Sequence, residues 1–316
     1  MWVEDNCRET IDFIYDAFVE GLPEEYRASA RDLPHLLDLH DEVPSGTSWG
    51  RACDNVIQLG LPMFVLLESD HYVSEDLCIA ALRAHLFGQI AAMIHDRFAR
   101  LDLYPRADLC AILLLLERER DQIVAELCSL GGRARLDCSV AQREAREGVH
   151  KEQEFVAGDF ADIGDFVAVN AAKASPTFPA LLAGASAAGY GLHELGHLHE
   201  LIVGLALGIA ARDEICNWLE RAQLGRSWLA AVRASGRSLD ESITAMLDLA
   251  AASFNHAVRA AHSLGAATLA DWTRNQAEQI EVLLQRSGQL SGPRLARVLR
   301  TQLEVDAQRF SERRAA

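Results

Sequence analysis

Residues 201–211 decide the fold and read LIVGLALGIAA, and residues 212–217 follow as RDEICN. The first part is apolar on every side of a helix, and Gly204 and Gly208 allow a neighbouring helix to approach closely, so this helix belongs in a core. In the second part, Asp213 and Glu214 lie four and three residues before Asn217, which directs their oxygens the same way. Polar side chains directly after an apolar helix segment are expected if they bind a divalent cation, and equally if the end of the helix emerges into water.

The rest of the chain is also helical in pattern. Apolar residues recur three and four apart, as at Ile11, Ile14 and Phe18, and alternating segments joined by Asn-Gly or Asp-Gly turns are missing. The sequence therefore predicts an all-α fold, and we expect one domain over residues 1–316 because no low-complexity linker or clear repeat interrupts the pattern. The predicted helices span residues 5–20, 25–40, 48–69, 74–101, 106–129, 138–159, 163–189, 191–222, 239–264, 266–287 and 293–312.

Three local signals mark helix ends. Gly131 and Gly132 are expected to stop one helix, and Ser238 with Glu241 has the form of a capping box. Pro293 stands where a helix begins, a position that tolerates proline because its missing N–H would be unpaired there.

Composition excludes several classes of protein. The 30 basic against 46 acidic side chains give a net charge of −16, which argues against nucleic acid as a partner because phosphate contacts need a basic face. The longest uncharged apolar runs, residues 109–116 and 201–211, fall short of the ~18 residues that cross a bilayer, so we expect no membrane span. Residues 1–7 lack the pattern of a secretory signal, and the seven cysteines lack C-x-x-C spacing, so we expect a cytoplasmic protein with reduced thiols.

Four short segments occur in an order that resembles the polyprenyl synthase family. They are residues 93–96 (MIHD), 158–163 (GDFADI), 173–175 (KAS) and 213–217 (DEICN). They are similar to the family's Leu-Ile-His-Asp, Gly-Gln-x-x-Asp-Ile, Lys-Thr/Ser and Asp-Asp-x-x-Asp, over roughly residues 74–220. The resemblance implies the isoprenoid-synthase fold, a single large helical bundle with a central apolar cavity, which also serves class I terpene synthases.

The resemblance also implies a site. Magnesium ligands would be Asp96, Asp213, Glu214 and Asn217, and the catalytic residues would be Asp96, Asp213 and Lys173. The substrate would be a prenyl diphosphate, bound by Lys173, Arg97, Arg100 and Arg106, with its chain beside Ala91, Ala92 and Phe160. In the family, the residues four and five places before the first aspartate often set the chain length, and family members form dimers.

The departures from the family pattern narrow the expected reaction. Arg97 and Arg100 follow Asp96 where the first motif should continue with carboxylates, and positive charges there oppose metal binding. The family's Gly-Lys-x-x-Arg, which grips the second substrate of elongation, is reduced to Gly50 and Arg51. We therefore expect an atypical class I terpene synthase or related enzyme that ionises an allylic prenyl diphosphate, uses fewer magnesium ions and does not elongate chains.

Three alternatives remain open. Lost carboxylates are also what a catalytically silent subunit would show, one that pairs with an active synthase instead of forming a homodimer. Residues 193–197, HELGH, match the zinc protease motif H-E-x-x-H, but a third ligand at Glu214 would lie 17 positions after His197, about 26 Å along one helix. Glu68 and His71 add a second E-x-x-H unit, the pattern of di-iron bundles.

Overall fold

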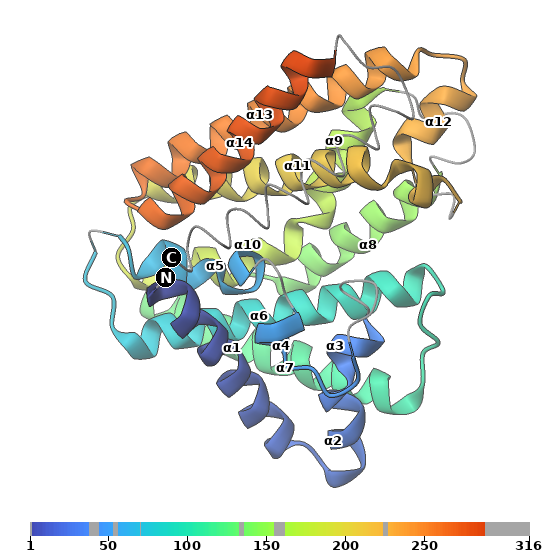
Figure 1. The fold of residues 1–316 in the computed structure, drawn as a ribbon. Coiled ribbons are helices and arrows are strands. Elements are labelled where there is room, and N and C mark those ends of the chain that lie inside the picture. Colours follow the sequence, from blue (N-terminus) through green and yellow to red (C-terminus); the bar gives the residue numbers. More distant parts are fainter. Residues whose placement is uncertain are drawn as a thin grey trace. The chain divides into compact units, whose positions relative to one another are not determined.

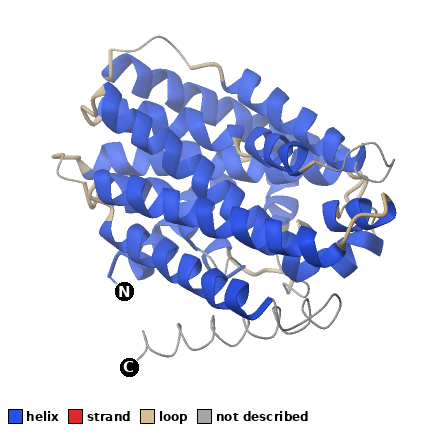
Figure 2. Cartoon of the chain, turned by 90° about the horizontal axis from the view of Figure 1, so that it is seen from above, coloured by secondary structure: helices blue, strands red, loops and turns tan. Residues whose placement is uncertain are grey.

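The computed structural model describes residues 2–37, 44–52, 56–69, 71–132, 136–154, 162–223 and 227–287. Within these ranges the chain consists of helices and connecting loops, without a strand (Figures 1 and 2). The predicted all-α class is therefore confirmed.

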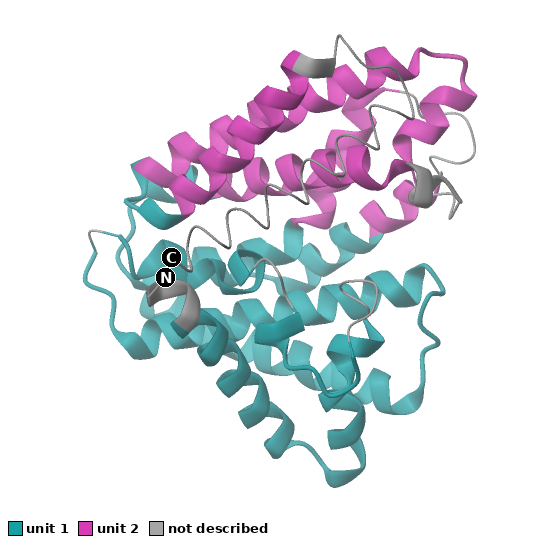
Figure 3. Cartoon of the chain, in the orientation of Figure 1, with its two compact units in different colours: residues 1–146, 175–198, 263–268 teal, residues 147–174, 199–262, 269–316 magenta. Residues whose placement is uncertain are grey.

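The chain forms two compact units (Figure 3). Unit 1 comprises Met1–Arg146, Ser175–Leu198 and Ser263–Thr268, and unit 2 comprises Glu147–Ala174, His199–His262 and Leu269–Ala316. The chain passes between the units repeatedly, so neither unit is one continuous stretch of sequence. The expectation of one domain over residues 1–316 stays a prediction.

Unit 1 is built around α6 (Glu75–Ala99), which packs against α5 (Val56–Leu66), α7 (Ala107–Leu130) and α10 (Phe178–Ala187). Every residue from 84 to 91 of α6 is buried, so the middle of this helix is enclosed on all sides. Four further helices of unit 1 precede α5: α1 (Trp2–Gly21), α2 (Glu24–Arg31), α3 (Leu33–Leu36) and α4 (Trp49–Ala52).

Unit 2 contains most of the long helix α11 (Leu192–Gln223) and the end of α8 (Cys138–Glu154). A Cβ on Gly204 would lie 2.8 Å from the Ser253 carbonyl oxygen, and one on Gly208 would lie 2.8 Å from the Phe254 ring. Both contacts are too short for any side chain, which confirms that these glycines permit close packing between helices. The other helices of this unit are α9 (Ile163–Lys173), α12 (Trp228–Ala234), α13 (Leu239–Ser263) and α14 (Ala267–Ser287).

Most predicted helices are found, and the differences have local causes. The predicted helix 163–189 breaks into α9, the 3-10 turn η2 (Ser175–Thr177) and α10, because Pro176 and Pro179 cannot continue an α-helical ladder. The predicted helix 25–40 breaks at Asp32, two residues before Pro34. Helix α12 was not predicted, and the predicted helix 293–312 lies outside the described residues.

Two of the three predicted helix-end signals are found, and the third, the helix start at Pro293, lies outside the described residues. Gly131 ends α7 and Gly132 has φ +62, the left-handed conformation that glycine adopts without strain. The Ser238 hydroxyl accepts a hydrogen bond from the Glu241 amide at 3.4 Å, as in a capping box.

In the part of the chain that the structure describes, two helices have the length and mean hydropathy of a membrane span, α6 and residues Leu192–Trp218 of α11. In α6, 67% of the apolar window is buried inside the structure, and a core helix passes the same test. The expectation of no membrane span stays a prediction.

Candidate functional site

The residues of the first motif lie at the end of α6, in unit 1. The Arg100 guanidinium contacts Asp96 Oδ1 through Nη2 at 2.9 Å and Nε at 3.0 Å, one helical turn apart. Arg97 forms a second pair with Asp102 at 3.4 Å. Arg100 and Arg97 therefore pair with Asp96 and Asp102, which reduces the net negative charge at this end of α6.

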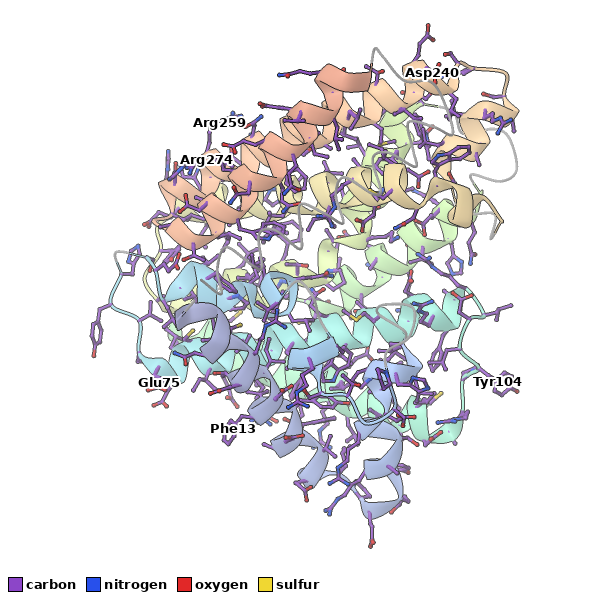
Figure 4. All side chains as sticks on the ribbon, in the orientation of Figure 1. Phe13, Glu75, Tyr104, Asp240, Arg259 and Arg274 are labelled. Carbon is purple, nitrogen blue, oxygen red and sulfur yellow. The ribbon has the colours of Figure 1, made fainter. Side chains whose placement is uncertain are left out.

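The loop between α6 and α7 carries the third expected arginine. Arg106 immediately precedes α7 and contacts Asp108 at 2.9 Å, while Ser29 of α2 donates to the same carboxylate. The hydrogen bond from Ser29 and the positive charge of Arg106 outweigh the effect of burial and lower the pKa of Asp108. Tyr104, on the same loop, is 80% exposed and points away from the helices (Figure 4).

The three residues expected beside the prenyl chain have different surroundings. Ala91 is fully buried in α6, whereas Ala92 is partly exposed. Phe160 lies outside the described residues, as does most of the segment 158–163. The prediction that small side chains on α6 set the depth of an apolar cavity stays a prediction.

Lys173 lies at the end of α9 in unit 2, and its ammonium contacts Glu152 of α8 at 3.0 Å. The Glu152 side chain is only 2% exposed. Gly148 makes the approach possible, because a Cβ there would lie 3.1 Å from Lys173 Cγ and 2.9 Å from the Val169 carbonyl oxygen. Sequence reasoning missed Glu152, since it precedes Lys173 by 21 residues and no local spacing links them.

The residues of the segment 213–217 lie on α11 in unit 2, and their side chains have two different environments. The Asp213 side chain is 43% exposed and contacts its neighbour Arg212 at 3.2 Å, and Asn217 is partly exposed one turn later. Glu214 is fully buried, and its Oε1 accepts hydrogen bonds from the Ser227 hydroxyl at 2.6 Å and the Leu229 amide at 3.0 Å. Glu214 therefore holds the first turn of α12, while Asp213 and Asn217 remain the more accessible oxygens of the motif.

The structure gives the glutamate of the H-E-x-x-H motif a structural role. Glu194 is the third residue of α11, and its Oε2 accepts a hydrogen bond from the Gly191 amide at 2.7 Å, as in a capping box. Its Oε1 lies 2.6 Å from His71 Nε2. The hydrogen bonds from His71 and Gly191 lower the pKa of Glu194 below its usual value. A carboxylate held on both oxygens fits a structural role better than that of a general base.

Glu68 and His71, the residues of the other E-x-x-H pattern, contact different parts of the structure. Glu68 accepts a hydrogen bond from the Thr268 amide at 2.8 Å, whereas His71 stacks on Tyr190 with ring centroids 4.4 Å apart. Among the residues that the structure describes, no group of three or more His, Cys, Asp or Glu side chains has the arrangement of a metal site. These contacts favour structural roles for Glu68, His71 and Glu194 over a di-iron centre.

Comparison with known proteins identifies the fold. No protein-family model matches the chain, and no curated protein is significantly similar to it in sequence. The crystal structure of a polyprenyl synthetase from Streptomyces coelicolor A3(2) is similar with a TM-score of 0.56, over 96% of this chain and 97% of that chain. The chain has the all-α isoprenoid-synthase fold. The two chains are 13% identical, so the likeness shows the fold alone.

Proposed function

We propose that this chain is a prenyl-diphosphate-dependent enzyme of the class I terpene synthase type, which ionises an allylic diphosphate and does not elongate it. The observation that carries the proposal is the position of the two motif-like segments, on α6 and α11 of a chain with the isoprenoid-synthase fold. The similar structure from Streptomyces coelicolor A3(2) is named a polyprenyl synthetase, which supports a prenyl diphosphate as the substrate class.

The accessible side-chain oxygens of Asp213 and Asn217 would suffice for a single magnesium ion. Mg²⁺ is usually bound by one or two carboxylates together with substrate phosphates and water. Asp213 and Asn217 would hold it, and the ion would neutralise charge on the departing diphosphate. Glu214 would act as a positioning residue, because its contacts with α12 fix the turn of α11 that carries Asp213.

The arginines at the end of α6 would bind diphosphate directly. A guanidinium matches phosphate oxygens with two parallel hydrogen bonds and stays charged at any physiological pH. A diphosphate carries more negative charge than one carboxylate, so it competes with Asp96 for Arg100 and with Asp102 for Arg97. In this proposal, Asp96 keeps Arg100 in place until the substrate arrives.

A second candidate is a catalytically silent subunit of an active synthase. The ion pair between Asp96 and Arg100 and the burial of Glu214 favour it, since both reduce the carboxylate charge available for metal ions. A homodimer fits the first candidate, and a heteromer fits the second.

Product analysis separates the two candidates. Purified protein is incubated with geranyl, farnesyl or geranylgeranyl diphosphate and Mg²⁺, with and without isopentenyl diphosphate, and products are identified by mass spectrometry. The proposal predicts a hydrocarbon or alcohol from at least one substrate, and the same product when isopentenyl diphosphate is present. A longer prenyl diphosphate would contradict the non-elongating assignment. No product from any substrate, together with binding to an active synthase, would favour the silent subunit.

A further inference from the structure

An arginine beside the accessible carboxylate of α11 is held in place by an uncharged side chain. Arg212 directly precedes Asp213, and both lie in unit 2 together with Gln276 of α14. The Arg212 guanidinium donates a hydrogen bond from Nη1 to Gln276 Oε1 at 2.7 Å. It also donates to Asp213 Oδ1, from Nε at 3.4 Å and from Nη2 at 3.2 Å. The shortest of the three hydrogen bonds is therefore with a neutral acceptor that lies 64 positions away in the sequence.

These contacts orient Arg212 without cancelling its charge. Hydrogen bonds from a guanidinium to a carboxylate are usually about 2.7–2.9 Å long. Arg100 comes close to this range in its pair with Asp96, at 2.9 and 3.0 Å, whereas both contacts of Arg212 with its carboxylate are longer. Because Gln276 is neutral, its short hydrogen bond fixes the guanidinium and leaves the positive charge available to an anion.

Arg212 and Asp213 both keep groups that a ligand can use. A guanidinium has five N–H donors, and the three hydrogen bonds to Gln276 and Asp213 use three of them. In the part of the chain that the structure describes, both contacts of Asp213 fall on Oδ1, so Oδ2 remains for a metal ion. The side chains of Arg212 and Asp213 are 25% and 43% exposed, so solvent reaches both. An anion bound to a metal ion at Asp213 would therefore also lie beside Arg212.

We propose that Arg212 binds the diphosphate group of the substrate together with the Mg²⁺ ion at Asp213, and that Gln276 is the residue that positions it. The proposal rests on the proposed function, because it adds a ligand for the same diphosphate. A guanidinium pairs with phosphate oxygens through two parallel hydrogen bonds, and cations beside a departing diphosphate stabilise the charge that develops on it. The segment 213–217 holds one metal ion, and Arg212 supplies further positive charge for the leaving group.

Binding of inorganic diphosphate in the absence of metal ions tests the role of Arg212. The dissociation constant is measured by isothermal titration calorimetry with EDTA present. We expect Arg212→Gln to weaken binding about 30-fold, as for the loss of charge-assisted hydrogen bonds. Asp213→Ala should bind at least as tightly as wild type under these conditions, because the carboxylate acts only through Mg²⁺ and its removal releases Arg212. Equal binding by Arg212→Gln and wild type would overturn the proposal and leave the proposed function intact.

The variant Arg274→Gln is the matched control for the lost charge. Arg274 also lies on the outside of α14 (Figure 4), two residues before Gln276, and contacts Asp271 at 2.7 Å. This variant should change the dissociation constant of inorganic diphosphate by less than about twofold, because a distant surface charge is screened by salt. A loss as large as that of Arg212→Gln would overturn the proposal, since it would assign the effect to the net charge of the chain.

Two variants of Gln276 separate positioning from folding. Gln276→Glu keeps an acceptor of the same size and adds a negative charge, so it holds Arg212 more tightly but cancels its charge. Gln276→Leu removes the acceptor. We expect both variants to weaken the binding of inorganic diphosphate, and Gln276→Glu to do so with an unchanged or higher urea midpoint. Binding retained in Gln276→Glu would overturn the role of Gln276 as a neutral positioning residue.

Turnover of prenyl diphosphates distinguishes the failure of this proposal from that of the proposed function. If the wild-type chain binds inorganic diphosphate through Arg212 but releases none from any prenyl diphosphate, the proposed function fails and the diphosphate site stands. If Arg212→Gln leaves both binding and Mg²⁺-dependent diphosphate release at the wild-type level, this proposal fails and the proposed function stands.

Discussion

Replacing Glu214 by alanine tests whether this carboxylate holds helix α12 or a metal ion. Glu214 is fully buried and accepts hydrogen bonds from the Ser227 hydroxyl at 2.6 Å and the Leu229 amide at 3.0 Å. A buried donor left without its acceptor costs about 1–3 kcal/mol, and two donors lose their acceptor in the variant. We therefore expect Glu214→Ala to lower the free energy of unfolding by about 4 kcal/mol.

Urea denaturation followed by circular dichroism measures this loss as a shift of the midpoint. Asp213→Ala is the matched control, because the Asp213 side chain is 43% exposed and its contact with Arg212 is near the surface. Its free energy of unfolding should change by no more than about 1 kcal/mol. Glu214→Gln keeps an acceptor oxygen for both donors, so it should lose less stability than Glu214→Ala.

We expect the two alanine variants to rank in the opposite order when enzymatic activity is measured instead of stability. If Asp213 is the metal ligand and Glu214 only positions it, Asp213→Ala should abolish diphosphate release in a chain that folds normally. Glu214→Ala with the wild-type urea midpoint would refute the reasoning. So would Glu214→Gln that folds like wild type but no longer responds to Mg²⁺, since that result would return Glu214 to the metal ligands.

Three further predictions follow from buried or tightly packed groups. Burial lowers the pKa of His85 to about 4 in the folded chain, below its ordinary value of 6.5, so the unfolded chain binds the proton more tightly. The free energy of unfolding should therefore fall by about 3 kcal/mol as the pH drops from 6.5 to 4. In the variant His85→Gln, a pH series should show this loss removed. Gly208→Ala should destabilise by about 1 kcal/mol because its Cβ would lie 2.8 Å from Phe254, whereas Gly196→Ala, with nothing within 4 Å, should stabilise by up to about 1 kcal/mol in thermal melts; equal effects would contradict the packing of α11. Because both carboxylate oxygens of Glu194 are held by structural contacts, we expect 1,10-phenanthroline to leave the melting temperature unchanged, and a clear drop would restore the zinc alternative.

The sequence predicts helices well where apolar periodicity is long and end signals are strong. The predicted segments 74–101 and 106–129 correspond to α6 (Glu75–Ala99) and α7 (Ala107–Leu130). The break near Pro176 was missed because apolar residues continue at helical spacing across it, and α12 was missed because seven residues are too few to show a period.

The candidate site was harder to predict, because the roles of its residues depend on contacts with residues that are distant in the sequence. Glu214 looks like a solvent-facing acid in sequence, as most glutamates are, and only the return of the chain at Ser227 buries it. Lys173 likewise depends on Glu152, a residue on another helix. The pair of Arg100 and Asp96 was within reach of sequence reasoning, since the two residues are four apart on one helix and opposite in charge.

The central claim is that this chain ionises an allylic prenyl diphosphate. The most direct measurement is the release of inorganic diphosphate from geranyl, farnesyl and geranylgeranyl diphosphates in single-turnover reactions, with enzyme in excess and with or without Mg²⁺. The account predicts complete, Mg²⁺-dependent release from at least one of the three by the wild-type chain and none by Asp213→Ala. Intact substrate after prolonged incubation with all three, by protein that is folded and binds them, would contradict it.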